Sequence, residues 1–381
     1  MFSIIKNKSL VNKFKSNIDT LLLFFLILSI YSYIVYFSSK RIDADFYAHV
    51  EHIININQGI KSYPPNFFFY FIANLLSFFT SNRFFLYIVL ILLLSVSTIF
   101  KYIITKRIVS DYIFADPLFK RKFVILISFI CFFIYAIPDP FLFFIHKRMY
   151  LGKIAPVVWH NSTSILLFPF ALLLFWKQLQ LIIGKHKNTT KNILTIVFLI
   201  FLNIIIKPSF IFVFIPATFL ILVQSFLIKK IKFRELLFRI SPLLFGLLLI
   251  ILSSSLIYLF QYGSFQAESS SISINLFFIY KLFYPLVYFP VALLFSLFLP
   301  ILSIVFYPNI LKFKPFSYAF ILFVFSILIA VVFVESGPRL YHLNFLWQNI
   351  FTSYLLFLTN LIFLFNNYNK NLKFDYKFII L

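Results

Sequence analysis

Charged residues are scarce in this chain, at 12% of its 381 residues, about half of the share that is usual in a soluble domain. Apolar residues make up 62% of the chain, and the mean hydropathy is +0.98. No stretch between the apolar runs is long enough for a soluble domain of useful size. This scarcity of charge excludes a soluble globular protein and indicates one integral-membrane domain over residues 1–381.

Cysteine is nearly absent as well, since Cys131 is the only one. A single cysteine excludes a disulfide within the chain. Cys131 lies in an apolar run, where a lone cysteine usually serves as a small packing residue.

Acidic residues are few: 11, against 34 lysines and arginines, for a net charge of +23. The basic residues lie in short clusters between apolar runs, which is not the single basic face of a nucleic-acid-binding protein. We therefore expect no nucleic-acid partner. Lysine and arginine instead set the topology and contact anionic membrane lipids.

What the chain does have is a series of apolar runs, each close to the roughly 20 residues that a helix needs to cross a bilayer. If all of them cross, the basic segment 106–122 lies outside, which violates the positive-inside rule. If segment 63–80 does not cross, every strong basic cluster, including 101–122, faces the cytoplasm, and so do both termini. The sequence thus predicts an all-α bundle of about ten spans: 20–37, 84–104, 123–138, 163–178, 192–206, 209–228, 237–260, 285–306, 316–334 and 344–365.

The segment 63–80 is expected to lie along, or dip into, the outer surface. It opens with Tyr63-Pro64-Pro65, and prolines suit the first turn of a helix, where backbone N–H groups have no partner within the helix. Its many phenylalanines and tyrosines also favour the interface.

Polar residues that can do chemistry collect in the predicted outer loops. The strongest pattern there is the pair Asp43 and Asp45, directly after the first span. Two carboxylates at this spacing can bind a divalent cation such as Mg²⁺ or Mn²⁺, or supply a general base. On a helix, His49 would share a face with Asp45. The alternative is that these residues are only a solvated loop.

The stretch Arg41–His49, followed by Tyr63-Pro64-Pro65, resembles the first outer loop of the GT-C superfamily of integral-membrane glycosyltransferases. The resemblance covers the arrangement of roughly residues 15–180. The second outer loop departs from it, because Asp139 is its only carboxylate. The resemblance implies a GT-C-like fold and an inverting transfer of a sugar from a polyprenyl-phosphate carrier to a glycan, lipid or protein acceptor.

The resemblance also implies where the reaction takes place and which residues serve it. The active site would face the outside of a bacterial inner membrane, and Asp43 or Asp45 would be the base; the spacing does not rank the two. A divalent cation, if present, would bind to this pair. The candidates for binding substrate and phosphate are His49, Asp139, Arg148, His160, Asn161, Arg339 and His342.

Several of these candidates have a second interpretation. The segment Trp159-His160-Asn161 is either an interfacial tryptophan with polar neighbours or part of the pocket. Arg339 and His342 form either a turn or a clamp for the carrier phosphate. For Lys207, before Pro208, the sequence favours a turn residue whose amine extends to the membrane surface.

Three other classes of protein compete with the enzyme. A flippase or other transporter of lipid-linked glycans would place ionisable residues inside the spans, which by sequence are almost free of charge. A polysaccharide polymerase usually has arginine-rich outer loops, whereas the arginines here are scattered. A non-catalytic envelope-assembly protein remains the third alternative.

Overall fold

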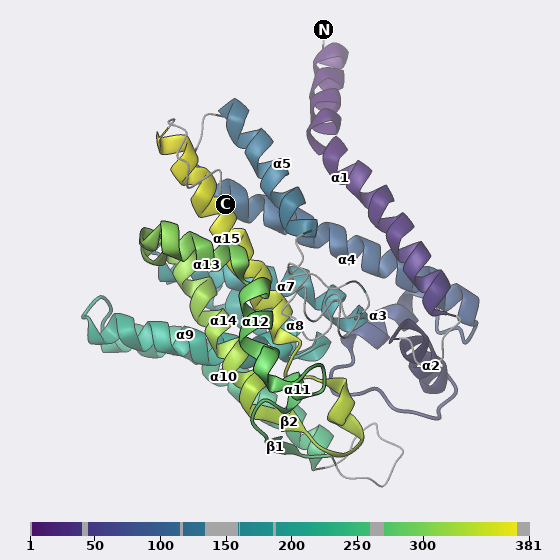
Figure 1. The fold of residues 1–381 in the computed structure, drawn as a ribbon. Coiled ribbons are helices and arrows are strands. Elements are labelled where there is room, and N and C mark those ends of the chain that lie inside the picture. Colours follow the sequence, from purple (N-terminus) through teal and green to yellow (C-terminus); the bar gives the residue numbers. More distant parts are fainter. Residues whose placement is uncertain are drawn as a thin grey trace.

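The computed structural model describes residues 2–39, 45–114, 117–133, 159, 161–185, 188–259 and 270–371. This part of the chain is nearly all helix, with two short strands (Figure 1). The helices pack into one bundle, and α1 extends from it toward the N-terminus (Figure 1).

Among the described residues, seven helices are long and apolar enough to cross a membrane. An eighth span is formed if two segments that meet at a 66° bend, Leu286–Ser296 and Phe298–Phe306, are taken as one. The seven helices are α1 (Phe2–Ser38), α4 (Arg83–Tyr112), α7 (Ser162–Ile182), α9 (Ser209–Leu227), α10 (Phe233–Tyr258), α14 (Lys314–Val332) and α15 (Gln348–Asn371).

The structure thus confirms a polytopic helical membrane protein, but three of the ten expected spans differ from an ordinary crossing helix. The span expected at 192–206 is α8 (Thr190–Ile206), with only 17 residues. The one expected at 285–306 is broken between α12 (Phe289–Ser296) and α13 (Phe298–Phe306). The span at 123–138 is described only as far as Phe133, the last residue of α5 (Pro117–Phe133).

The first polar segment forms two short helices, α2 (Asp45–Asn57) and α3 (Phe68–Leu76). With nine residues, α3 is about 14 Å long and too short to cross roughly 30 Å of hydrocarbon. This agrees with the expectation that segment 63–80 does not cross. The expected position of the prolines is wrong, however, because Pro64 and Pro65 precede α3 instead of forming its first turn.

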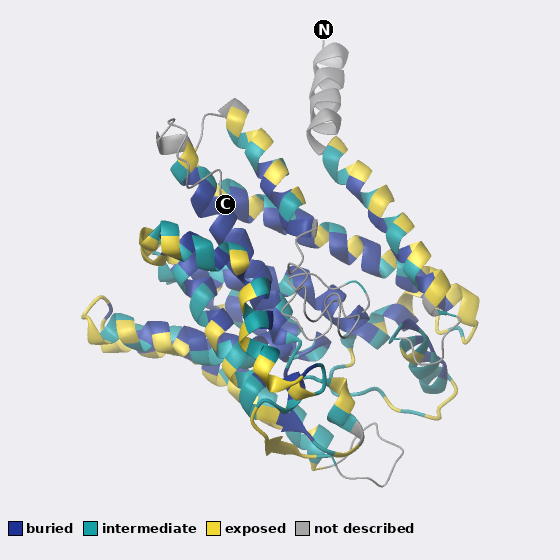
Figure 2. Ribbon diagram, in the orientation of Figure 1, coloured by how far each residue is buried: buried dark blue, intermediate teal, exposed yellow. Residues whose placement is uncertain are grey.

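The core of the bundle surrounds α15, which contacts α14, α5, α9 and α7. In its apolar window 89% of the residues are buried, against 22% in α1 and in α10 (Figure 2). The exposed residues of α10 include Leu244, Leu248 and Leu252. Outward-facing leucines of this kind are typical of a helix that contacts lipid at the rim of a membrane bundle.

The only strands in the described ranges are β1 (Ile272–Ile274) and β2 (Phe333–Glu335). They pair antiparallel, with Ile272 opposite Glu335. The strand β2 directly follows α14, and the 3₁₀ helix η3 (Gly337–His342) follows β2. This ribbon therefore fixes Glu335, Arg339 and His342 relative to the end of α14.

Candidate functional site

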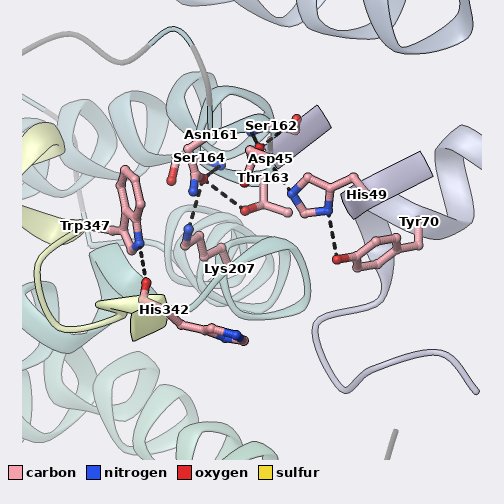
Figure 3. Close-up of polar contacts among 10 residues, drawn as sticks. All are labelled: Asp45, His49, Tyr70, Asn161, Ser162, Thr163, Ser164, Lys207, His342 and Trp347. Carbon is pink, nitrogen blue, oxygen red and sulfur yellow. Dashed lines mark hydrogen bonds and ion pairs between the residues drawn. The ribbon is translucent and has the colours of Figure 1, made fainter. Parts of the chain in front are cut away.

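Polar side chains from four separate parts of the chain meet in one cluster (Figure 3). They come from α2 and α3, from the N-terminus of α7, from the turn between α8 and α9, and from η3 and the segment that follows it. None of these parts is adjacent to another in sequence, so the site depends on the packing of the whole bundle.

Asp45 is the first residue of α2, and its carboxylate contacts the N-terminus of α7. Its Oδ2 accepts hydrogen bonds from the backbone N–H of Ser162 at 3.1 Å and from the Ser162 hydroxyl at 3.2 Å. The first N–H groups of a helix have no partner within the helix and attract negative charge. The same oxygen lies 3.4 Å from Nε2 of His49, one turn along α2.

These contacts determine the charge of Asp45. Burial alone would raise the pKa of this carboxyl, but His49, the Ser162 N–H and Lys207 outweigh burial and hold the pKa at about 2. The carboxylate is therefore ionised throughout the physiological pH range. A carboxylate with so low a pKa accepts a proton only from a group that has itself become acidic.

His49 links Asp45 to α3. Its Nδ1 lies 3.0 Å from the hydroxyl of Tyr70, and its ring packs against Phe69 with the centroids 5.1 Å apart. Thus α3 orients the imidazole that contacts Asp45. His52, one turn further along, contacts the Tyr70 ring in a tilted arrangement with the centroids 4.6 Å apart. Burial lowers the pKa of His52 to about 4, so it is neutral at pH 7.

Lys207 lies between α8 and α9, and the expectation that its amine extends to the membrane surface is wrong. The residue is 6% exposed, its Nζ donates to Oδ1 of Asn161 at 3.0 Å, and the Trp347 ring centroid lies 4.6 Å away. Burial lowers the pKa of Lys207 to about 7, although Asp45 and Glu335 favour the charged form. Lys207 is the only charged residue in 192–228, and this isolation within an apolar stretch is the signal by which the sequence could have indicated its role.

Asn161 is the residue that connects Lys207 to α7. Its Oδ1 also accepts from the Ser164 backbone N–H at 3.0 Å and from the Thr163 hydroxyl at 3.2 Å, so the side chain caps α7. Capping explains an asparagine at this position in physical terms. The structure thus places Asn161 within this polar cluster, because its side chain also accepts a hydrogen bond from the amine of Lys207.

Glu335 fixes the side chain of Arg339 through an ion pair. The Arg339 Nε donates to Oε1 of Glu335 at 2.8 Å, and the Glu335 side chain is only 1% exposed. Tyr258 and Asn344 donate to the same carboxylate at 2.5 and 2.7 Å. Arg339 is thus fixed in a turn while 31% of its side chain stays exposed.

His342 is connected to Lys207 through Trp347. The indole Nε1 of Trp347 donates to the backbone carbonyl of His342 at 2.9 Å, and the Trp347 ring contacts the Lys207 amine. Burial lowers the pKa of His342, with Arg339 as the next cause. His342 therefore adds no positive charge at neutral pH.

Four predicted site residues lie outside the described residues: Asp43, Asp139, Arg148 and His160. The structure brings together the rest of the predicted set, namely Asp45, His49, Asn161, Arg339 and His342. Within the described ranges, no three histidine, cysteine or acidic side chains form a group that could hold a metal ion. The expected cation ligand Asp43 is not among the residues to which that statement applies.

Sequence reasoning missed Ser162 and Tyr70 as parts of the site. Ser162 donates to Asp45 through its backbone N–H as well as its hydroxyl, and a backbone donor is not revealed by residue type. Tyr70 is one of many aromatic residues in its segment. Comparison with family models, with curated proteins and with solved structures gave no match for this chain.

Proposed function

We propose that this protein is a membrane glycosyltransferase that transfers a sugar from a polyprenyl-phosphate carrier to an acceptor hydroxyl, with Asp45 as the base. The observation that carries the proposal is the placement of an ionised carboxylate at the same end of the bundle as two basic side chains. Asp45 accepts a hydrogen bond from Ser162. Asn161, which precedes Ser162 in sequence, accepts one from Lys207. Such a gathering of charged and titratable groups is typical of an active site.

In the proposed reaction, the acceptor oxygen attacks the anomeric carbon and the bond from that carbon to the phosphate oxygen breaks. The electron pair leaves with the carrier phosphate, which needs no proton. Lys207 and Arg339 supply positive charge for the leaving phosphate. The acceptor proton moves to Asp45 late, when the new bond has made that proton acidic, because the pKa of Asp45 is low.

The acceptor side of the transfer would be a hydroxyl group close to Asp45 and His49. We place the site at the outer face of a bacterial inner membrane, since the charge distribution puts α2 and α3 outside. The GT-C-like arrangement, the ten spans and a divalent cation bound by Asp43 and Asp45 belong to this proposal as well.

The second candidate function is transport of a lipid-linked glycan, and one observation favours it. Lys101 is buried within α4, and ionisable residues inside spans are common in transporters. The two functions differ in their product: the enzyme releases carrier phosphate, whereas the transporter moves the intact carrier across the bilayer.

The test uses purified protein in liposomes with a panel of radiolabelled polyprenyl-phosphate hexoses and a mixed glycan acceptor. We expect Asp45→Asn to lower the release of carrier phosphate by about 10²-fold or more, while the amide still accepts the Ser162 hydrogen bonds. The control is Asp111→Asn, which makes an equal change of charge near the C-terminus of α4. This variant should retain the activity.

A single outcome would reject the enzyme: carrier phosphate release that is equal in wild-type protein and Asp45→Asn. Movement of labelled carrier across the bilayer without release of phosphate would show a transporter instead.

A further inference from the structure

The turn between α3 and α4, residues 77–82, presents two adjacent phenylalanine side chains outward. Phe78 is 85% exposed, more than any other large apolar side chain in the described part of the chain. Phe79 is 54% exposed, and Phe84, in the first turn of α4, is 74% exposed. Single apolar side chains are normal on a protein surface, but a group of them marks a contact with a membrane or with another protein.

The backbone of this turn keeps both rings outside. Phe78 and Phe79 have φ angles of 53° and 56°, in the left-handed region, which is strained for a phenylalanine. Hydrogen bonds fix this conformation. The Phe79 N–H donates to the Asn74 carbonyl at 2.8 Å, and Nδ2 of Asn57 on α2 donates to the Thr80 carbonyl at 2.9 Å. Two consecutive strained residues that the surrounding structure holds in place point to a function of the turn.

The apolar surface of the turn continues along α3. Phe71 and Leu75, one helical turn apart, are both exposed. On the other face of the helix, Phe69 is buried and Tyr70 contacts His49. Thus α3 has one face against the protein, where it reaches the candidate site, and an apolar face that points outward.

The same surface also continues along α4, on which α3 packs. Ile88, Leu92 and Val96 follow Phe84 at intervals of four residues, and all four side chains are exposed. They form one face of a helix that is long and apolar enough to cross a membrane. The outward apolar face of such a helix contacts lipid. Lipid is therefore also the occupant that fits the neighbouring apolar surface of α3 and the turn.

Polar groups directly after the two phenylalanines mark where the apolar surface ends. Ser81 and Asn82 are exposed, and the half-exposed side chain of Arg83 pairs with Glu51 of α2. Polar and charged groups remain at the lipid head groups when neighbouring aromatic rings enter the acyl region. A change from apolar to polar within so few residues is typical of an element at the membrane surface.

We propose that the turn between α3 and α4 inserts Phe78 and Phe79 into the phospholipid leaflet next to the candidate site, at the boundary between head groups and acyl chains. The partner of this surface is a lipid leaflet and not another protein. The insertion fixes the depth of α3 in the membrane, and thereby the depth of Tyr70 and of His49, which it contacts. This lipid contact does not depend on the function proposed above, because it rests on exposure and backbone geometry.

The experiment measures what surrounds residue 78. A nitroxide spin label is attached to Phe78→Cys in the background Cys131→Ser, and the full-length protein is reconstituted into liposomes of phosphatidylethanolamine and phosphatidylglycerol. Molecular oxygen concentrates among the acyl chains, whereas a neutral nickel chelate stays in water. We expect oxygen to relax this label more strongly than the nickel chelate does.

Two control positions calibrate the signal. Gln58 is an exposed polar residue directly after α2, so the label on Gln58→Cys should be relaxed more strongly by the nickel chelate. Leu92 lies on the exposed face of α4, so Leu92→Cys should resemble Phe78→Cys. If Phe78→Cys does not reconstitute, Phe79→Cys takes its place with the same expected result.

Either of two results would overturn the proposal. Stronger relaxation by the nickel chelate than by oxygen at residue 78 would place the turn in water. Weak relaxation by both reagents would show that protein covers the turn, and dipolar broadening between labels would then identify the cover as a second copy of this chain.

Discussion

At the scale of single residues, the site contains two groups whose charge depends on where they are buried. Asp45 keeps its charge because a helix N-terminus and His49 stabilise the carboxylate. Lys207 has one neutral hydrogen-bond acceptor, Asn161, and its pKa falls to about 7 through burial. A lysine of this kind changes its charge near neutral pH, which an exposed lysine does not do.

Lys207 should make the stability of the protein depend on pH. Its pKa is about 7 in the folded state and near 10.5 without burial, so between these values the unfolded chain binds the extra proton. Stability contributed at this position therefore rises with pH from about 7 to 10. We expect the melting temperature of wild-type protein, relative to that of Lys207→Met, to rise by at least about 2 °C over this range.

The measurement is thermal unfolding in detergent at a series of pH values, with Lys230→Met as the control. Lys230 is exposed, so its removal should leave the pH dependence of wild-type protein intact. A constant difference between wild-type protein and Lys207→Met from pH 7 to 10 would contradict the prediction.

The burial of Lys207 shows what the sequence could not predict at this scale. Its hydrogen-bond partner Asn161 is 46 residues away, and local patterns contain no information about such a contact. Asp45 and His49 could be predicted, because their spacing on a helix is local. The contact of Asp45 with His49 could therefore be predicted from the sequence, whereas the burial of the Lys207 amine near it could not.

At the scale of elements, two helices begin with an asparagine cap in very different surroundings. Asn82 caps α4, where its Oδ1 accepts from the Phe85 N–H at 3.1 Å in an exposed position. Asn161 caps α7 in the same way but also accepts from Lys207. The two positions form a matched pair that separates the cap from the contact with the amine.

Replacing each cap by alanine should have unequal effects. Asn82→Ala removes only a cap and should cost about 1 kcal/mol. Asn161→Ala removes a cap and also leaves a buried amine without its acceptor, so the loss should be larger by roughly 1–3 kcal/mol. Unfolding in a denaturing detergent series measures both. Equal losses of stability would show that the hydrogen bond from Lys207 to Asn161 does not stabilise the folded protein.

The lengths of the elements explain why the sequence overestimated the regular spans. An apolar run indicates a buried or lipid-facing segment but not where a helix bends, and Leu297 separates α12 from α13 within one such run. The nine-residue α3 is an opposite case. The apolar run at 63–80 alone would suggest a further span, whereas the distribution of basic residues over the whole chain indicates that this segment does not cross.

At the scale of the whole molecule, the sidedness of the bundle connects the site to its proposed role. The site residues come from α2 and α3, from the N-terminus of α7, from the turn between α8 and α9, and from η3 and the segment after it. If segment 63–80 lies along the outer surface, Ser81 and Tyr341 lie on the outer side of the membrane and Gly184 lies on the cytoplasmic side. Tyr341 is 75% exposed, and Gly184 is in an exposed turn.

Cysteine labelling tests this arrangement directly in the variant Cys131→Ser. A membrane-impermeant maleimide added to intact cells should label Ser81→Cys and Tyr341→Cys, but label Gly184→Cys only after the cells are opened. Labelling of Gly184→Cys in intact cells, with Ser81→Cys and Tyr341→Cys labelled only after the cells are opened, would instead mean that segment 63–80 crosses the membrane.

The most buried of the described spans, α15, is made after the helices on which it packs. Until it emerges, Tyr354 cannot reach Thr105, its partner at 2.8 Å and 249 residues earlier, and Asn366 cannot reach the Tyr112 carbonyl, 254 residues earlier. Until then, the faces of the earlier helices that pack against α15 have no contact with it. Until α15 has been made, the insertion machinery or lipid has to cover these faces in its place.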